Sequence, residues 1–158
     1  VRTVVGDMRD VRLGRRFDVV LVHDAVDYMT TLNDAHRAVA TAAAHLRPGG
    51  VCIIAPTYVA EAFTDHETAH DAREAGDIEL SYVSHVRRTD ANVVEMTLLI
   101  MLRETGELSI VEDRHRCGLF ASAEWEAMMR NAGLEVVGRG DEIEGELPFR
   151  AFVVTYPR

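Results

Sequence analysis

The sequence has none of the features that mark a membrane or secreted protein. None of its apolar runs approaches the ~20 residues that a bilayer-spanning helix needs, and no secretory signal peptide is visible. Cysteine is scarce: Cys52 and Cys117 are the only two, and both have apolar neighbours, which is typical of reduced thiols in a core. These absences predict a cytoplasmic protein with no membrane partner.

Basic residues are also in short supply. The chain has 17 Lys and Arg against 26 Asp and Glu, a formal net charge of −9 at pH 7. A nucleic-acid partner is therefore not expected, because phosphate binding needs a basic surface. With 47% hydrophobic and 27% charged residues, the 158-residue chain has an ordinary globular composition and enough length for one core. We expect a single domain over residues 1–158 and a small-molecule partner.

A strand-helix-strand stretch in the first third of the chain organises the predicted fold. Phe17–Val22 is an unbroken β-branched run that predicts a strand buried on both faces. Thr31–Leu46 is rich in alanine and has a helical apolar period, with Thr31 or Asn33 as its N-cap. An Arg-Pro-Gly-Gly turn then leads into a second apolar strand, Val51–Ala55. The spacing predicts a βαβ unit with parallel strands, and hence an α/β fold.

The same stretch resembles the class I S-adenosylmethionine-dependent methyltransferases. FDVVLVHDAVDYM followed by LRPGGVCIIAP is similar to the family's fourth and fifth strands, the first of which ends at the cofactor. VVGDMR, residues 4–9, resembles the third strand, whose Asp meets the adenine amino group. The resemblance implies a Rossmann-like methyltransferase sheet, S-adenosyl-L-methionine as cofactor, and cofactor-binding positions at Asp7, Met8 and His23.

The cofactor-side residues have structural alternatives. Asp7 would accept a hydrogen bond from the exocyclic amine of adenine while the Met8 amide donates to the ring. Gly-Asp is also common turn chemistry, so Asp7 could simply close a turn. His23 stands at the carboxyl end of a predicted strand, where α/β sheets bind ligands, but it could equally satisfy loop carbonyls.

The family's N-terminal strands are missing from this sequence. Its glycine-rich first loop is expected upstream of Val4, and neither that loop nor the acidic residue that holds the ribose is present. The family's strand order, 3-2-1-4-5-7-6, places two absent strands between a predicted strand at Arg2–Asp7 and the strand Asp18–Val22. We therefore expect that edge to be completed by rearrangement or by a partner chain, and this chain alone to bind the cofactor weakly. The alternative function is a non-catalytic remnant, or a half-site that needs a partner chain.

The second half predicts an inserted antiparallel sheet over residues 78–115. Its connections are short enough for hairpins, and its middle strand is apolar on both sides, so that one face should meet a ligand or a second subunit. A helix capped by Ser122 and a closing strand pair should follow. The predicted strands are Ile78–Arg88, Val93–Arg103 and Leu108–His115 in the insertion, then Leu134–Gly138 and Phe149–Tyr156 around a charged loop.

This half extends the resemblance to small-molecule methyltransferases related to aminosugar N-dimethyltransferases and glycine/sarcosine methyltransferases. It rests on the inserted strands, His-x-x-Gly-Leu-Phe from His115, a Trp-containing helix and Ala-Gly-Leu-Glu-Val. In those relatives the inserted sheet covers the active site and often forms the dimer interface, which implies a homodimer here. His115 is then a substrate-side residue, although a structural hydrogen bond at a strand end is an equal alternative.

The function that follows is methyl transfer from S-adenosylmethionine to a nitrogen or oxygen of a small molecule. Such an in-line displacement depends mainly on positioning. His23 and His115 are the catalytic candidates, because histidine ordinarily titrates near neutral pH and can deprotonate the acceptor.

A zinc-peptidase pattern suggests a third, less favoured function. Residues 66–70 read His-Glu-Thr-Ala-His, and HExxH places two histidines on one helix face around zinc with Glu67 as the base. Charged residues flank the motif, and no third ligand is evident, so we interpret residues 57–76 as a solvated, helix-prone crossing. We therefore expect no metal, and a zinc hydrolase that uses His66, Glu67 and His70 is the weakest alternative.

Overall fold

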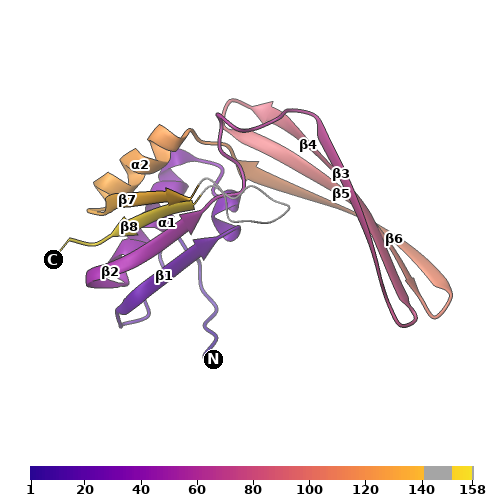
Figure 1. The fold of residues 1–158 in the computed structure, drawn as a ribbon, viewed down its shortest axis with the longest axis horizontal. Helices are drawn as coiled ribbons and strands as arrows, with labels where there is room; N and C mark the ends of the chain where they lie inside the picture. Colours follow the sequence, from indigo (N-terminus) through magenta and orange to yellow (C-terminus); the bar gives the residue numbers. More distant parts are fainter. Residues whose placement is uncertain (141–150, 158) are drawn as a thin grey trace.

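The computed structural model describes residues 1–140 and 151–157. They form two sheets, with helices packed on one of them and the other projecting away as a long arm (Figure 1). The elements in chain order are β1 (Phe17–His23), the short 3-10 helix η1 (Ala25–Tyr28), α1 (Leu32–Ala44), β2 (Leu46–Ala55), β3 (Glu67–Ala75), β4 (Ile78–Asp90), β5 (Val93–Glu104), β6 (Glu107–Gly118), α2 (Ser122–Asn131), β7 (Glu135–Gly140) and β8 (Ala151–Thr155).

The first sheet has the strand order β1-β2-β8-β7. β1 and β2 are parallel, with Val20 opposite Cys52, and α1 connects them, so the predicted βαβ unit is confirmed. β8 is antiparallel to both β2 and β7, which confirms a closing strand pair. This order is the 4-5-7-6 part of the order that the resemblance implied. The predicted start of the last strand at Phe149 and most of the charged loop lie outside the described residues.

Helix α1 begins where its sequence supplies a cap. Thr31 is the N-cap, and its side chain accepts a hydrogen bond from the Asp34 N–H at 3.1 Å. The helix buries Ala35, Val39 and Ala42 against the sheet. Small side chains allow the helix to approach β2 closely, whereas a cavity separates part of it from β1. It ends at Ala44, two residues before the predicted end at Leu46, which already belongs to β2.

The main core lies between the first sheet and its helices. Trp125 on α2 meets Phe120 edge to face, with ring centroids 5.7 Å apart, and both side chains are buried. Cys52 and Cys117 are free, buried thiols, as predicted. Ser122 is the first helical residue rather than the cap: Ala121 takes the cap position, and Glu124 accepts its N–H at 2.7 Å.

Two predictions about the N-terminal region are wrong. Arg2–Asp7 forms no strand and leads away from the sheet (Figure 1), because a strand needs a hydrogen-bonded neighbour and the segment lies beside none. It does not pair with β1, so the edge of Asp18–Val22 is not completed by rearrangement. One face of β1 is also open in the described structure: Val19 and Leu21 are 62% and 65% exposed, which contradicts burial on both faces. Completion of this edge by a partner chain stays a prediction.

The inserted sheet is larger than predicted. Its order is β3-β4-β5-β6, all antiparallel, so the three expected strands are confirmed and a fourth precedes them. Residues 57–76, interpreted as helix-prone, contain β3 instead. This strand pairs with β4 along its whole length, and Gly76 makes the turn between them with φ of 62°. Ladder hydrogen bonds to β4 here override local helix propensity.

The middle strand of the insertion is not buried on both faces by this chain. Leu99 is 44% exposed, while Val94 at the base of β5 is fully buried with Cys117 and Leu119. The prediction that a second subunit or a ligand covers the exposed face stays open. No helix of the described residues is long and apolar enough to cross a membrane.

Candidate active site

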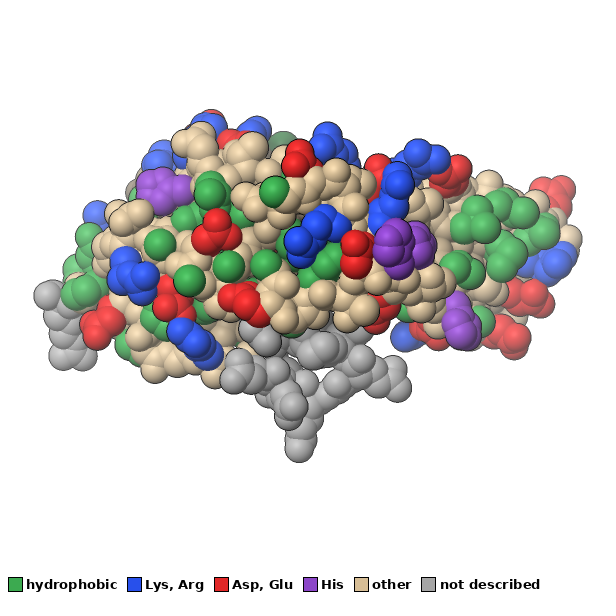
Figure 2. Space-filling view, turned by 90° about the horizontal axis from the view of Figure 1, so that it is seen from above, with side chains coloured by type: hydrophobic (Ala, Val, Ile, Leu, Met, Phe, Trp, Pro, Cys, Tyr) green, Lys and Arg blue, Asp and Glu red, His purple; other side chains and the backbone are tan. Residues whose placement is uncertain are grey.

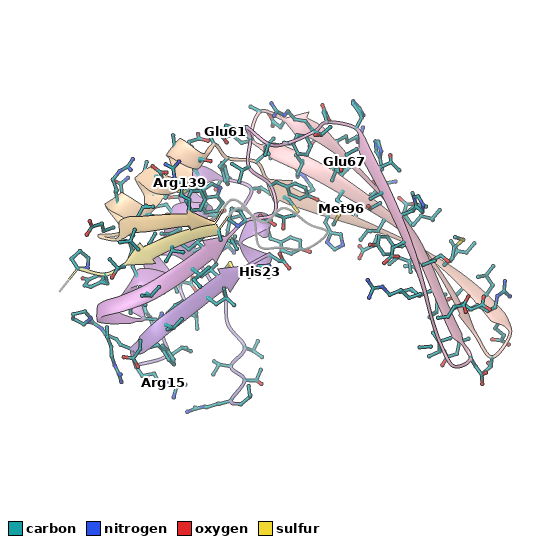
Figure 3. The ribbon with its side chains drawn as sticks, in the orientation of Figure 1. Arg15, His23, Glu61, Glu67, Met96 and Arg139 are labelled. Atoms are coloured by element: carbon teal, nitrogen blue, oxygen red, sulfur yellow. The ribbon has the colours of Figure 1, made fainter. Side chains whose placement is uncertain are left out.

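The carboxyl ends of β1 and β2 meet the base of the inserted sheet. β1 ends at His23, η1 follows it, and Met96 on β5 projects toward the same junction from the other side (Figure 3). Ligands of open α/β sheets bind outside the carboxyl ends of parallel strands. The junction is therefore the place where the fold itself predicts a site.

A buried carboxylate ties the two strand ends together. Asp27, in η1, is only 5% exposed, and both of its oxygens lie 3.1 Å from the N–H of Thr57, just beyond β2. Burial raises the pKa of Asp27 to about 6, partly offset by its hydrogen bonds with Thr57. Sequence analysis did not single out Asp27. The signal was weak: an acid five residues after the end of a predicted strand, in the loop at its ligand-binding end.

His115 connects the two sheets through Tyr28. The Tyr28 hydroxyl lies 2.7 Å from Nδ1 of His115, and Nε2 of His115 lies 3.1 Å from Oδ2 of Asp113. Burial and, after it, nearby acidic groups raise the pKa of Tyr28 above its usual value. The predicted substrate-side histidine is thus at the junction, hydrogen-bonded at a strand end. A role in catalysis for His115 stays a prediction.

His23 lies at the end of β1, next to η1. Its Nδ1 is 3.1 Å from the Asp24 carboxylate, and its side chain is 41% exposed. Asp24 has φ of 49°, a left-handed conformation that turns the chain sharply after the strand. His23 therefore faces an open region and is held by its neighbour in sequence.

Met8 and His23 line one cavity. It has a volume of about 320 Å³ and lies between residues 8–13, β1 and α1, with mainly apolar walls that include Val22 and Ala25. Neither Asp7 nor His115 is among its lining residues. The structure thus brings two of the three predicted cofactor-binding residues together and leaves the third beside them in sequence.

Asp7 forms the turn that was its structural alternative. Its Oδ1 accepts the backbone N–H of Arg9 at 2.9 Å, and Oδ2 pairs with the Arg9 guanidinium at 2.6 Å. These hydrogen bonds lower the pKa of Asp7 to about 2. Nε of Arg9 also donates to both oxygens, at 3.0 and 3.1 Å, so Asp7 can accept from an adenine amine only if Arg9 gives up part of this contact. Its role in cofactor binding stays a prediction.

These residues fit the adenine end of S-adenosylmethionine. An apolar slot suits a planar ring, and its volume lies within the range of roughly 300–1,000 Å³ that is usual for ligand pockets. Contact of Met8 and His23 with the adenine ring, and of Asp7 with its amine, stays a prediction.

The zinc pattern is in a strand rather than a helix. His66 precedes β3, and Glu67 and His70 belong to it. Residues four apart in a strand are separated by about 13 Å instead of one helical turn, so the pattern loses the geometry on which zinc binding depends. Among residues 1–140 and 151–157, no group of three or more His, Cys, Asp or Glu side chains is placed to hold a metal ion.

Comparison with known proteins agrees with this geometry. Residues 1–54 match a family described as "Methyltransferase domain". The chain is 35% identical over 154 residues to dTDP-3-amino-3,4,6-trideoxy-alpha-D-glucopyranose N,N-dimethyltransferase of Streptomyces venezuelae, covering 96% of this chain and 63% of that protein. It is 33% identical over 133 residues to dTDP-3-amino-3,6-dideoxy-alpha-D-glucopyranose N,N-dimethyltransferase of Streptomyces fradiae, covering 83% and 52%.

Solved structures give the same result. DesVI from Streptomyces venezuelae superposes with a TM-score of 0.86 at 34% identity, over 97% of this chain and 64% of that one. CalS10 from Micromonospora echinaspora, an amino pentose methyltransferase solved with S-adenosylmethionine, gives 0.83 at 28% identity, over 96% and 63%. The chain thus spans less than two thirds of the length of these relatives.

The sheet order and these matches place the chain among the class I S-adenosylmethionine-dependent methyltransferases of the small-molecule type. Within that class it is similar to sugar N,N-dimethyltransferases.

Proposed function

We propose that the protein methylates the amino nitrogen of a small sugar acceptor. The observation that carries this proposal is the Tyr28–His115–Asp113 group at the junction of the two sheets. An amine is mostly protonated at neutral pH and cannot attack a methyl group until a base removes its proton, whereas this group offers a route for that proton. The names of the relatives, which are N,N-dimethyltransferases of amino sugars, support nitrogen over oxygen.

Local charge also supports a cationic acceptor. Asp27 and Asp113 approach the junction from η1 and β6, and both raise the pKa of Tyr28. Two acidic side chains beside one phenol favour the approach of an ammonium group over that of a neutral hydroxyl. S-adenosylmethionine, when bound, supplies an activated methyl group. Met8 and His23 would hold its adenine, with Asp7 accepting from the amine.

We further propose a homodimer that forms through the inserted sheet, in the cytoplasm. Figure 2 shows apolar side chains gathered at the far end of this sheet. Such residues are rarely left together on a monomer surface. The reduced thiols support the location. The exposed apolar residues of the insertion are Ile78, Val83, Leu99, Leu108, Ile110 and Val111.

The test is an assay of the protein that carries this chain, with S-adenosylmethionine and two matched nucleotide sugars, one with an amino group and one with a hydroxyl at the same carbon. We expect mass spectrometry to detect a methylated amine and no methyl ether. Methylation of the hydroxyl sugar alone would overturn the proposal. Calorimetric titration with S-adenosylhomocysteine distinguishes an active methyltransferase from the alternative function. Absence of binding would favour a non-catalytic remnant or a half-site that needs a partner chain.

A further inference from the structure

Both ring nitrogens of His115 are already occupied. Nδ1 lies 2.7 Å from the Tyr28 hydroxyl, and Nε2 lies 3.1 Å from the Asp113 carboxylate. The imidazole can contact an acceptor only by giving up one of these partners. The group that remains accessible is Tyr28, which is 51% exposed, whereas the His115 side chain is 23% exposed.

The carboxylate favours one tautomer of His115. A negative charge 3.1 Å from Nε2 favours the proton on that nitrogen. In a neutral imidazole the other nitrogen, Nδ1, then carries a lone pair. The Tyr28 hydroxyl therefore donates its proton to Nδ1, and the lone pairs of its oxygen are left to accept a hydrogen bond from outside.

Tyr28 is firmly placed for this role. Asp27, the residue before it, is buried and anchors η1 to the N–H of Thr57. The titratable groups that face Tyr28 are Asp27 on its own turn and Asp113, His115 and Cys117 on β6. Burial and the acidic groups raise the pKa of Tyr28, so it is a phenol rather than a phenolate at neutral pH. A phenol can accept and pass on a proton at the same time.

We infer that Tyr28 contacts the acceptor nitrogen and relays its proton to His115, an inference that rests on the proposed function. The Tyr28 oxygen takes a proton from the acceptor ammonium while its own proton moves to Nδ1 of His115. The acceptor becomes a neutral amine with a free electron pair, and His115 becomes an imidazolium that Asp113 stabilises. Tyr28 ends as the phenol it began as. His115 and Asp113 act through Tyr28 and are positioning and proton-accepting residues.

The first test separates proton transfer from structure by pH. We expect Tyr28→Phe to lower kcat by roughly 100-fold at pH 7 with little change in KM, because general base catalysis typically contributes that much. At about pH 9.5, where much of the acceptor amine is already neutral, the variant should come within a few fold of the unmodified enzyme. Tyr156→Phe is the matched control, because Tyr156 lies at the opposite end of the first sheet, bonded to Gly50. A loss of equal size at both pH values would overturn the relay.

The second test needs no turnover. In the intact protein, ¹⁵N spectra of His115 should show the Nε2–H tautomer, and Asp113→Asn should mix the two tautomers. Glu112→Gln is the control, because alternation along β6 directs Glu112 to the other face of the sheet. A His115 with Nδ1–H in the unmodified protein would overturn the inference whatever the activity. If the tautomer is as expected but no amine is methylated, the proposed function fails and the hydrogen-bond chain stands.

Discussion

The two sheets differ in what holds them together. In the first sheet, Cys52, Ile54 and Val154 are fully buried, and α1 and α2 cover the face that they line. In the inserted sheet, the buried apolar side chains of the described strands are Val86, Val93, Val94 and Cys117, all toward the base, where Val94 and Cys117 pack with Leu119 against the segment that contains Tyr58 and Phe63. Beyond that base the insertion is held mainly by backbone ladders. The first sheet therefore carries the stability of the domain, and the insertion is free to vary its side chains.

The largest expected effect on folding is at the core of the first sheet. Trp125→Ala should lower the free energy of unfolding by about 3–5 kcal/mol, because it removes a buried indole and leaves a cavity. Urea denaturation followed by circular dichroism measures the change. Val111→Ala, at an exposed position of the insertion, is the contrast and should change stability by no more than about 0.5 kcal/mol. Equal losses of unfolding free energy in the two variants would contradict the conclusion that the first sheet carries most of the stability.

The next effect depends on pH and concerns the junction. The pKa of Asp27 is raised from 3.8 to about 6, so the folded state binds the proton more tightly than the unfolded state. Stability from this group is present below pH 4 and is lost as pH rises through 6, by about 3 kcal/mol in all. Asp27→Asn cannot titrate. The difference in unfolding free energy between the two proteins should therefore move in favour of the variant from pH 4 to pH 7, and a constant difference would show that Asp27 is not perturbed.

A smaller effect tests how tightly the insertion is seated. A Cβ atom added at Gly118 would lie 2.3 Å from the carbonyl oxygen of Met29 and 2.6 Å from the Phe120 ring. Gly118→Ala should therefore cost about 1–3 kcal/mol, the usual cost of overpacking. At Gly138 the added atom would meet Val153 at an ordinary 3.8 Å. If Gly118→Ala is no more harmful than Gly138→Ala in thermal unfolding, the base of the insertion is loosely packed.

The smallest effect on stability should accompany a large effect on association. Ile110 and Val111 are 60% and 52% exposed, and neighbouring strand residues point to opposite faces. A double variant, Ile110→Asp with Val111→Asp, thus places charge on both faces of the insertion. We expect near-unchanged unfolding but a shift from dimer to monomer in sedimentation velocity. Arg87→Asp makes the same change in net charge near the base of this sheet, away from the exposed apolar residues, and serves as the control. A dimer that persists in the double variant would exclude this sheet as the interface.

Local pattern was sufficient wherever an element carries its own signal. The β-branched run of β1, the Thr31 cap of α1 and the hairpins of the insertion all lie close to their predicted bounds. The helix-prone interpretation of residues 57–76 was wrong at β3, because Glu67–Ala75 becomes a strand through its hydrogen bonds with β4. Arg2–Asp7 shows the reverse, since its strand-like residues have no partner.

The site was predicted in part, for a related reason. His23 and His115 could be found because they follow or end predicted strands, and the structure places both at the junction of the sheets. Tyr28 and Asp27 were harder. Their importance depends on contacts to His115 and Thr57, which are distant in sequence. In the sequence alone, Asp27 cannot be distinguished from an exposed acidic residue of a loop, because its burial depends on the hydrogen bond with Thr57.

The inserted sheet is attached at one end only, so the effect of a rotation grows with distance from its attachment. A parallel bridge between Val59 and Phe120 joins the two chain segments by which it is attached, and β5 extends about 40 Å from that attachment. His115 is three residues, or about 10 Å, from the base of β6 at Gly118. Rotation of the sheet about its attachment therefore displaces His115 only about a quarter as far as it displaces the tip. A displacement of about 2 Å at the far end would therefore move His115 by only about 0.5 Å, which keeps its 2.7 Å hydrogen bond to Tyr28 within range.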